Sequence, residues 1–130
     1  VMDLGTATTI DAVDENGSFL GGSILPGVVT ALDALIDKTA QLPDIELKAP
    51  GDVVGKNTAE CMQSGIMYGT AAMLDGMADR ICESMGIKTC SIIATGGIAG
   101  IIAPLCRHEL ILEEDLVLKG LGIIYRKLNK

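Results

Sequence analysis

The sequence predicts an α/β domain in which a three-stranded antiparallel meander is extended by further strands, with helices packed on the sheet. Residues 9–14 alternate between polar and apolar side chains, which is the periodicity of a strand, and residues 15–17 form a turn signal. A helical pattern follows at 58–85, and a buried strand pattern with a helix behind it follows at 88–105. Hydrophobic residues make up 48% of the 130 residues, so the chain can bury a core as one domain.

The first strand leads into a polar segment, Asp3-Leu4-Gly5-Thr6-Ala7-Thr8-Thr9, which we expect to form a tight turn between two strands. Gly5 lets the backbone bend and lets a ligand approach it, and successive N–H groups and hydroxyls can face an oxyanion. Asp3, at the end of a strand, can hold a cation or a metal-bound water. Two interpretations stay open: a phosphate-and-cation cradle, or an ordinary hairpin with strand-favouring threonines and a solvated aspartate.

Composition excludes some classes of function. The formal net charge of −7 and the pI near 4.5 argue against nucleic-acid binding, which calls for a basic patch. We find no apolar run that could span a membrane and no basic leader of a signal peptide, so we expect a cytoplasmic protein without a membrane partner. The chain does not begin with methionine and opens on a strand, which suggests a piece of something longer or a processed chain.

The cysteines and the single histidine give no metal-binding pattern. We find no CxxC pair among Cys61, Cys82, Cys90 and Cys106, and each has apolar neighbours, so we expect buried reduced thiols rather than metal ligands or disulfides. His108 is expected to be a surface residue in a loop.

The meander is completed by a return strand at 18–25, where Gly21-Gly22 predicts a bulge or a close backbone approach. Pro26-Gly27 ends this strand and starts a helix that should end near Thr39-Ala40. The expected buried face of that helix consists of Val28, Leu32, Leu35 and Ile36. A long connection at 41–55 follows, and connections of this length are uncommon unless they are functional.

A long helix is predicted from Thr58 to Met85, because Asn57 and Glu60 resemble a helix cap and Gly86 is a good C-terminal signal. Gly65 and Gly69 should present a flat backbone face to another helix or subunit. The apolar face is expected to consist of Met62, Ile66, Met73, Met77 and Ile81.

A buried strand is predicted at 88–95, followed by Thr95-Gly96-Gly97 and a short helix at 98–105. A strand, a glycine pair and a helix start can seat the sugar or phosphate of a nucleotide, although many α/β proteins use glycine there for packing alone. A short strand at 110–112 and a last helix at 115–129 complete the chain. The buried stripe of that helix is expected to be Val117, Leu121, Ile124 and Leu128.

This order of elements is the half-unit of the actin-like (ribonuclease H-like), sugar-kinase-like ATPase fold, in which ATP lies between two such halves. Within it, an ordered set of segments that covers essentially the whole chain resembles the type III pantothenate kinases. The first segment resembles that family's second phosphate motif, and Thr95-Gly96-Gly97 resembles its adenosine motif. The set comprises Asp3-Leu4-Gly5-Thr6-Ala7-Thr8-Thr9-Ile10-Asp11, Phe19-Leu20-Gly21-Gly22 with Ile24 and Pro26-Gly27, Thr39-Ala40-Gln41-Leu42-Pro43, Gly55-Lys56-Asn57-Thr58 with Met62-Gln63-Ser64-Gly65, Thr95-Gly96-Gly97, and Leu116-Val117-Leu118-Lys119-Gly120-Leu121.

The resemblance implies phosphorylation of pantothenate by ATP with Mg²⁺, the first step of coenzyme A synthesis. It implies that Asp3 binds a monovalent cation, K⁺ or NH₄⁺, and that Gly5 and Thr6 meet the ATP phosphates. Gly96 and Gly97 would lie against the adenosine, and Thr58 would contact pantothenate. The family works as a homodimer, and the long helix after Thr58 is our candidate for the subunit contact.

The chain departs from the family pattern in one large respect. We find neither the first phosphate motif, of the type Asp-x-Gly-Asn-Thr, nor the Gly-x-Asp-Arg segment that supplies the catalytic base. Both would precede Val1. We therefore expect 1–130 to be a single C-terminal domain with no catalytic residue of its own, inactive without the N-terminal half as partner. Asp11 and Asp14, the nearest carboxylates, should face solvent.

Two other functions stay open on the sequence alone. One is a different phosphotransferase or ATPase of the same superfamily, which would leave the segment 55–65 unexplained. The other is a non-catalytic relative, either an accessory factor associated with transcription or a dimerisation module.

Overall fold

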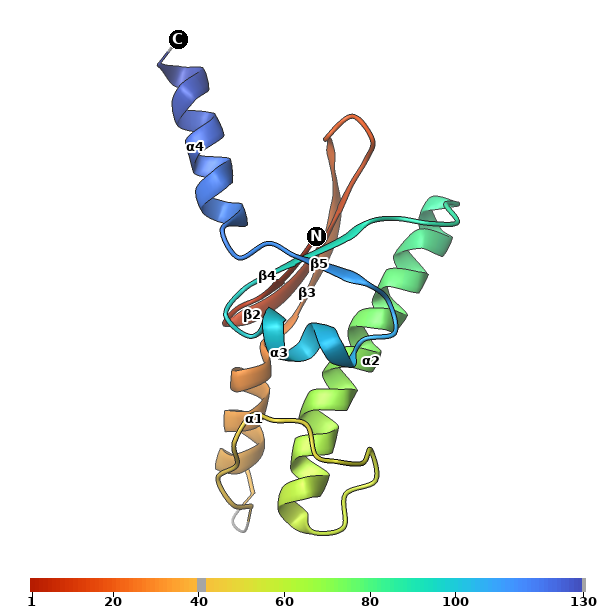
Figure 1. Ribbon diagram of the computed structural model, residues 1–130, viewed down its shortest axis with the longest axis vertical. Helices are drawn as coiled ribbons and strands as arrows, with labels where there is room; N and C mark the ends of the chain where they lie inside the picture. The colour runs from red at the N-terminus through yellow and green to blue at the C-terminus, as the bar shows by residue number, and fades with distance from the viewer. Residues whose placement is uncertain (40–41, 130) are drawn as a thin grey trace.

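The computed structural model describes residues 1–39 and 42–129, which form a mixed five-stranded sheet with helices (Figure 1). The strand order is β3-β2-β1-β4-β5. The predicted α/β class, with a meander extended by further strands, is confirmed. In chain order the elements are β1 (Met2–Leu4), β2 (Ala7–Val13), β3 (Phe19–Pro26), α1 (Val28–Asp37), α2 (Thr58–Met85), β4 (Ile92–Thr95), α3 (Ala99–Ile102), the 3-10 turn η1 (Ala103–Leu105), β5 (Leu110–Leu112) and α4 (Leu116–Leu128).

The meander pairs β1 with β2 and β2 with β3, both antiparallel, whereas β4 and β5 join the sheet as parallel strands. The predicted irregularity in the return strand is confirmed. The register between β2 and β3 shifts between Ala12 and Val13, opposite Gly21, whose φ of 115° lies in the region that favours glycine. A Cβ on Gly22 would lie 2.3 Å from the carbonyl oxygen of Ile10, so a close backbone approach accompanies the bulge.

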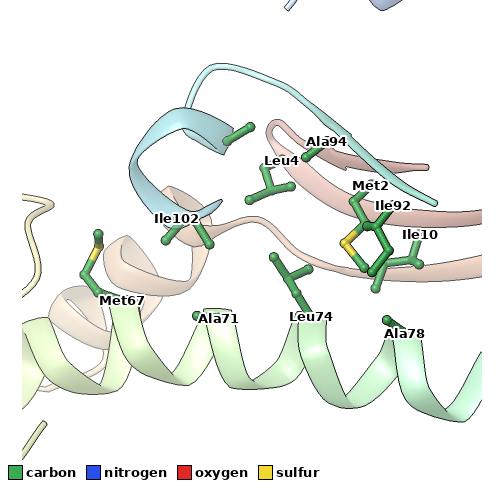
Figure 2. Packing of buried hydrophobic residues seen from close by; sticks show 11 residues of the cluster. Met2, Leu4, Ile10, Met67, Ala71, Leu74, Ala78, Ile92, Ala94 and Ile102 are labelled. Carbon is green, nitrogen blue, oxygen red and sulfur yellow. The ribbon is translucent and has the colours of Figure 1, made fainter. Parts of the chain in front are cut away.

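The core lies between one face of the sheet and α2 (Figure 2). Met2 and Leu4 point from β1 toward α2, where they meet the fully buried Leu74. Because successive side chains of a strand point to opposite faces, Asp3 is directed to the other side of the sheet. The other buried members of this cluster are Ile10, Met67, Ala71, Ala78, Ile92, Ala94, Ala99 and Ile102.

The bounds predicted for α2 are confirmed. They could be predicted from the sequence because local hydrogen bonds determine both ends of the helix. The Asn57 side chain accepts from the Glu60 N–H at 3.0 Å, and the Glu60 carboxylate accepts at 2.8 Å from the N–H of Lys56, one residue before the N-cap, in a variant of the capping box. At the other end Gly86 has a φ of 67°, and the Ile87 N–H donates to the Cys82 carbonyl at 3.0 Å.

The face of α2 that contacts the sheet differs from the predicted one. Of the expected face, Met62 is buried, whereas Ile66, Met73, Met77 and Ile81 are half-buried. The centre of the contact is formed by Met67, Ala71, Leu74 and Ala78. The small side chains let the helix come close to the strands, which moves Met73, Met77 and Ile81 to the edges of the core.

Two predicted elements are shorter or divided. The strand expected at 88–95 begins only at Ile92, because its register with β5 starts there and residues 88–91 are exposed. The helix expected at 98–105 divides into α3 and η1, where Pro104 cannot donate a backbone hydrogen bond. The strand predicted at 110–112 is confirmed as β5.

The first helix also differs at its edges. It ends at Asp37 rather than near Thr39, and Val28 and Leu32 are buried, whereas Leu35 is exposed and Ile36 half-buried. Ala40 and Gln41, which belong to the expected helix end and to the motif at 39–43, lie outside the described residues.

The expected buried stripe of α4 is wrong. The helix forms where it was predicted, but Leu121 is 57% and Leu128 80% exposed, and Val117 and Ile124 are exposed as well. Figure 1 shows α4 leading away from the sheet. An amphipathic stripe is therefore present, but within the described chain it lies open to solvent.

The cysteines are free, as expected, but not buried. Cys61 and Cys90 are exposed, and Cys82 and Cys106 are half-buried. Their apolar sequence neighbours had indicated burial, but each of these cysteines lies near the end of a helix or in a loop.

His108 lies in a loop, as predicted, and its Nε2 is 2.8 Å from the Asp79 carboxylate. Among the described helices, none combines the length and the apolar character that a membrane span requires.

Thr8 provides a test of the core. It pairs with Leu4 across the sheet and is 0% exposed, and within residues 1–39 and 42–129 its hydroxyl has no hydrogen-bond partner. Because a buried unpaired hydroxyl is costly, Thr8→Val should raise the free energy of unfolding by about 1 kcal/mol in urea titration. Thr9→Val, which changes the half-buried neighbour on the opposite face, is the matched control and should stay within about 0.5 kcal/mol. A destabilised Thr8→Val variant would contradict this account of the core.

Candidate functional site

The candidate site lies where β1 and β4 end. The two strands are parallel, with Met2 opposite Ala94 and Asp3 opposite Thr95, so their C-terminal ends meet at one edge of the sheet. The two loops that leave this edge begin with Gly5 and with Gly96. Ligands of open α/β sheets commonly bind outside the carboxyl ends of parallel strands, and the topology thus brings two glycine loops to such a position.

Asp3 and the glycine pair line the same pocket. Its volume is about 460 Å³, and Asp3, Thr95, Gly96 and Gly97 all contribute to its wall. The half-buried Asp3 carboxylate also leans over the neighbouring turn, since its Oδ1 lies 3.5 Å from the position of a Cβ on Gly5. The rest of the lining is Ala94, Ala99, Gly100, Ile101, Leu112, Glu114 and Val117.

The turn at Gly5 and Thr6 is supported by the start of α1. A Cβ on Gly27 would lie 2.1 Å from the Thr6 carbonyl oxygen, so the two backbones are in direct contact. The Thr30 hydroxyl donates to the same oxygen at 2.9 Å. In the described part of the chain, the N-cap Gly27 supplies no side-chain hydrogen bond to the first N–H groups of α1. The partly positive end of a helix therefore lies beside an exposed turn, an arrangement that favours anions.

The two glycines after β4 have different roles. Gly96 has a φ of 99°, and a Cβ there would meet the Leu4 carbonyl carbon and oxygen at 2.6 Å. Gly96 thus allows the β4–α3 turn to pack directly on β1. Gly97 is exposed, and a Cβ on it would meet no atom of the described residues within 4 Å. Packing accounts for Gly96, while Gly97 leaves open backbone at the pocket.

Thr58 lies elsewhere. It is the exposed first residue of α2, it does not line this pocket, and Figure 1 shows the start of α2 at the end of the molecule away from the β1–β4 edge. Thr6 is also outside the pocket lining, although the turn it belongs to adjoins Asp3. Of the predicted site residues, the structure brings Asp3, Gly96 and Gly97 into one pocket, with Gly5 and Thr6 adjacent.

The segment before Thr58 is held against α2 despite having no regular structure. The Gln63 side chain donates to the Glu46 carbonyl at 3.0 Å, and the Tyr68 hydroxyl donates to the Pro50 carbonyl at 3.2 Å. A Cβ on Gly55 would lie 2.4 Å from the Cys61 nitrogen, so the chain passes directly over the first turn of α2. These contacts explain how a long connection keeps a defined path to Thr58.

The pocket offers few protein side chains that could bind a cation. Asp3 and Glu114 are its acidic residues, and the described ranges contain no group of three or more histidine, cysteine, aspartate or glutamate residues that could hold a metal. Asp3 and Glu114 would bind a cation only together with further ligands, such as backbone oxygens, water or a bound phosphate. The cation ligand predicted at Asp3 stays a prediction.

Sequence reasoning missed Glu114 and Val117 as pocket residues. The Glu113 N–H donates to the Ala94 carbonyl at 2.9 Å, and the Thr95 hydroxyl donates to the Glu114 carbonyl at 3.5 Å. These bonds bring the chain after β5 to the same edge as Asp3. The available signal was the short strand at 110–112, but its parallel pairing with β4 could not be inferred from the sequence.

Asp11 and Asp14 lie away from the pocket and line a different cavity, beside the C-terminal end of α2. The Asp14 carboxylate accepts from the Ser18 N–H at 2.8 Å and from the Asn16 N–H at 2.9 Å. These bonds lower the pKa of Asp14, with Ser18 the larger cause. Asp14 is thus a turn residue, and both Asp11 and Asp14 are half-buried rather than fully exposed to solvent as expected.

Comparison with known proteins gives one consistent family. A family model described as type III pantothenate kinase matches residues 1–80. A type III pantothenate kinase of Moorella thermoacetica is 46% identical over 127 residues, covering 98% of this chain and 50% of the relative. One of Agathobacter rectalis is 39% identical over 130 residues, covering 100% of this chain and 50% of the relative. The chain thus spans about half the length of the curated relatives it matches.

A solved structure shows the same fold. The crystal structure described as a conserved putative Baf family transcriptional activator from Campylobacter jejuni superposes with a TM-score of 0.70 and 22% sequence identity. It covers 98% of this chain, which corresponds to 57% of that chain. At this identity the similarity supports the architecture alone.

The different roles of Gly96 and Gly97 can be tested by replacing each with alanine. Gly96→Ala should lower the free energy of unfolding by about 2–4 kcal/mol, because the new Cβ meets the Leu4 backbone and the φ is strained. The matched variant Gly97→Ala meets open space and should change the free energy of unfolding by less than about 1 kcal/mol. Denaturant titration measures both, and equal destabilisation would contradict the division of roles.

Proposed function

The chain belongs to the type III pantothenate kinase family, and we propose that it is the C-terminal half of an ATP-dependent pantothenate kinase. The complete protein would transfer a phosphoryl group from ATP to pantothenate, giving 4′-phosphopantothenate for coenzyme A synthesis. The observation that carries the proposal is the pocket at the β1–β4 edge, which Asp3 and Gly97 both line, beside the turn at Gly5 and Thr6.

In this proposal each residue positions a ligand. Asp3 supplies one oxygen ligand to a monovalent cation, K⁺ or NH₄⁺, while the backbone at Gly5 and Thr6, beside the start of α1, faces the ATP phosphates. Gly97 offers open backbone to the adenosine, and Gly96 fixes that loop on β1. Mg²⁺ enters with ATP and neutralises phosphate charge, since it commonly keeps most of its ligands as water and phosphate oxygens.

Thr58 is proposed to act at a site that a second subunit helps to form. It lies away from the pocket, on the helix whose exposed Gly65 and Gly69 would meet no described atom within 4 Å if each carried a Cβ. Such an open glycine face lets another helix approach closely. A homodimer through α2 would thus place pantothenate near Thr58 at the interface.

The catalytic base is proposed to come from the remaining half of the kinase. Phosphoryl transfer depends mainly on positioning and charge neutralisation, with a residue that orients the attacking hydroxyl. Asp11 and Asp14 line a different cavity from Asp3, so neither carboxylate is available as a base in the proposed ATP pocket. The half-length match to the curated kinases leaves room for a second half that contributes the base.

The remaining half of the kinase is also proposed to pack against α4. The stripe formed by Val117, Leu121, Ile124 and Leu128 is exposed along the whole helix, and Val117 also lines the pocket. An exposed apolar surface of this kind commonly marks an interaction site. Docking of the remaining half on α4 would close the pocket from the side of Val117.

The proposed function is tested by measuring ATP consumption with pantothenate and K⁺, with and without the remaining half of the kinase. We expect activity only when both halves are present, because this chain supplies part of the cradle and not the base. Leu121→Glu in this chain should abolish the reconstituted activity, whereas Arg126→Glu, on the opposite face of α4, should retain it.

Two other outcomes would contradict the proposal. Activity of this chain alone would overturn the assignment of the base to the remaining half and would make Asp11 the first residue to replace. If neither sample consumes ATP although both halves are folded and associate, the kinase assignment is overturned, and a non-catalytic relative or another substrate is favoured.

Asp3 is tested in the complete kinase through its cation dependence. Asp3→Asn keeps the size of the side chain and removes its charge, so the K⁺ concentration for half-maximal activity should rise about tenfold or more, which corresponds to about 1.4 kcal/mol of cation binding. Asp11→Asn is the matched control, because Asp11 lies outside the pocket. An unchanged K⁺ dependence in Asp3→Asn would remove Asp3 from the proposed cation site.

A further inference from the structure

Two cysteines meet where α2 ends. The Cys82 thiol donates to the Cys90 sulfur, and the two Sγ atoms are 3.1 Å apart. Cys82 lies in the last turn of α2, whereas Cys90 lies in the loop that leads to β4. Cys61 and Cys106 instead contact backbone carbonyl oxygens, those of Gly55 and of Ala71 and Ile102 respectively.

The contact follows from the way the helix ends. Gly86 adopts a left-handed conformation, and its N–H donates to the Glu83 carbonyl at 3.1 Å, while the Ile87 N–H donates to the Cys82 carbonyl at 3.0 Å. This turn reverses the chain, so that Cys90 returns to the side of Cys82 before β4 begins. Residues 88–91 are exposed and precede the paired part of β4, so the loop can yield by the roughly 1 Å that a sulfur–sulfur bond requires.

Both thiols can be reached by a small reagent. Cys90 is exposed and Cys82 half-buried, and both line a cavity of about 240 Å³ together with Met85 and Ile87. They also line a second pocket, together with Asp79 and His108. Cys106, in contrast, is held as a thiol, because burial raises its pKa to about 11.

We propose that Cys82 and Cys90 form a reversible intramolecular disulfide by exchange with a low-molecular-weight disulfide such as oxidised glutathione, which makes the α2–β4 turn a thiol-modification site. Cys90 loses its proton to solvent, and its thiolate attacks one sulfur of the reagent, whose other sulfur leaves as a thiolate and takes up a proton. Cys82 then loses its proton to solvent and attacks the Cys90 sulfur of the mixed disulfide, and the second reagent sulfur leaves as a thiolate that is protonated in turn. Two protein thiols are oxidised, and one reagent disulfide is reduced to two thiols.

The direction of the hydrogen bond supports this order of attack. Donation to Cys90 raises the pKa of Cys82 to about 11, with burial and the nearby Asp79 carboxylate as further causes. Cys82 therefore keeps its proton, while Cys90, the acceptor and the more exposed sulfur, meets the reagent first. Once Cys90 carries the mixed disulfide, Cys82 is already adjacent to the sulfur it must attack. The proposal does not depend on the kinase assignment.

The test exposes the folded chain to oxidised glutathione, alkylates the remaining thiols with iodoacetamide and digests the product for mass spectrometry. The background is Cys61→Ser/Cys106→Ser, because trypsin leaves Cys90 and Cys106 in one peptide, residues 89–107, and Cys82 in another, residues 81–88. We expect these two peptides to be joined and to separate after reduction with dithiothreitol. The oxidised chain should melt roughly 5 °C higher than the reduced chain, because a short loop is closed.

Single replacements supply the matched controls. In Cys82→Ser the mixed disulfide on Cys90 should persist, since the second attack has no thiol, and the melting temperature should not rise on oxidation. The unmodified chain is treated in parallel and digested with chymotrypsin, which can cut between Leu105 and Cys106, so the result does not depend on the folding of any variant. Alkylation of both Cys82 and Cys90 after oxidation, or a disulfide between two chains, would overturn the proposal.

Discussion

The alternation of side chains along β1 is the constraint on which the rest of the structure depends. Met2 and Leu4 are buried against α2, and between them Asp3 must point to the opposite face. β1 is also the central strand, paired with β2 on one side and β4 on the other. A shift of its register by one residue would place Asp3 in the core, so burial of two apolar side chains fixes the position of the candidate cation ligand.

Contacts between backbones then fix the loops around Asp3. Gly27 lies against the turn at Gly5 and Thr6, and Gly96 lies against Leu4, in each case at a distance that leaves no room for a Cβ. The two loops are therefore positioned by close packing on β1 and α1 rather than by side-chain hydrogen bonds alone. Such backbone contacts restrict the paths of the two loops, and restricted loops suit the positioning on which the proposed phosphoryl transfer would depend.

The two long helices show how far a sequence pattern reaches. For α2 the caps at Asn57 and Gly86 act within a few residues, and the predicted bounds were right. The choice of its buried face was wrong, since small side chains at Ala71 and Ala78 decided which side comes closest to the sheet. For α4 the apolar stripe is real, but whether a stripe is buried depends on what lies against it, and in the described chain it is exposed.

The local features and the family could be inferred from the sequence, because caps, turn glycines and alternation act between near neighbours and because the ordered motifs are specific. These features include the meander, the glycine-marked bulge and the ends of α2, and the motifs singled out the five residues now placed at or beside the pocket. The three-dimensional arrangement was needed to establish that Asp3 and Gly97 share a pocket, that Gly96 has a packing role, and that Glu114 and Val117 line the same pocket. Those relations follow from the parallel pairing of β1, β4 and β5. Parallel pairing joins strands far apart in the chain, and no local pattern specifies which strands will meet or in what register.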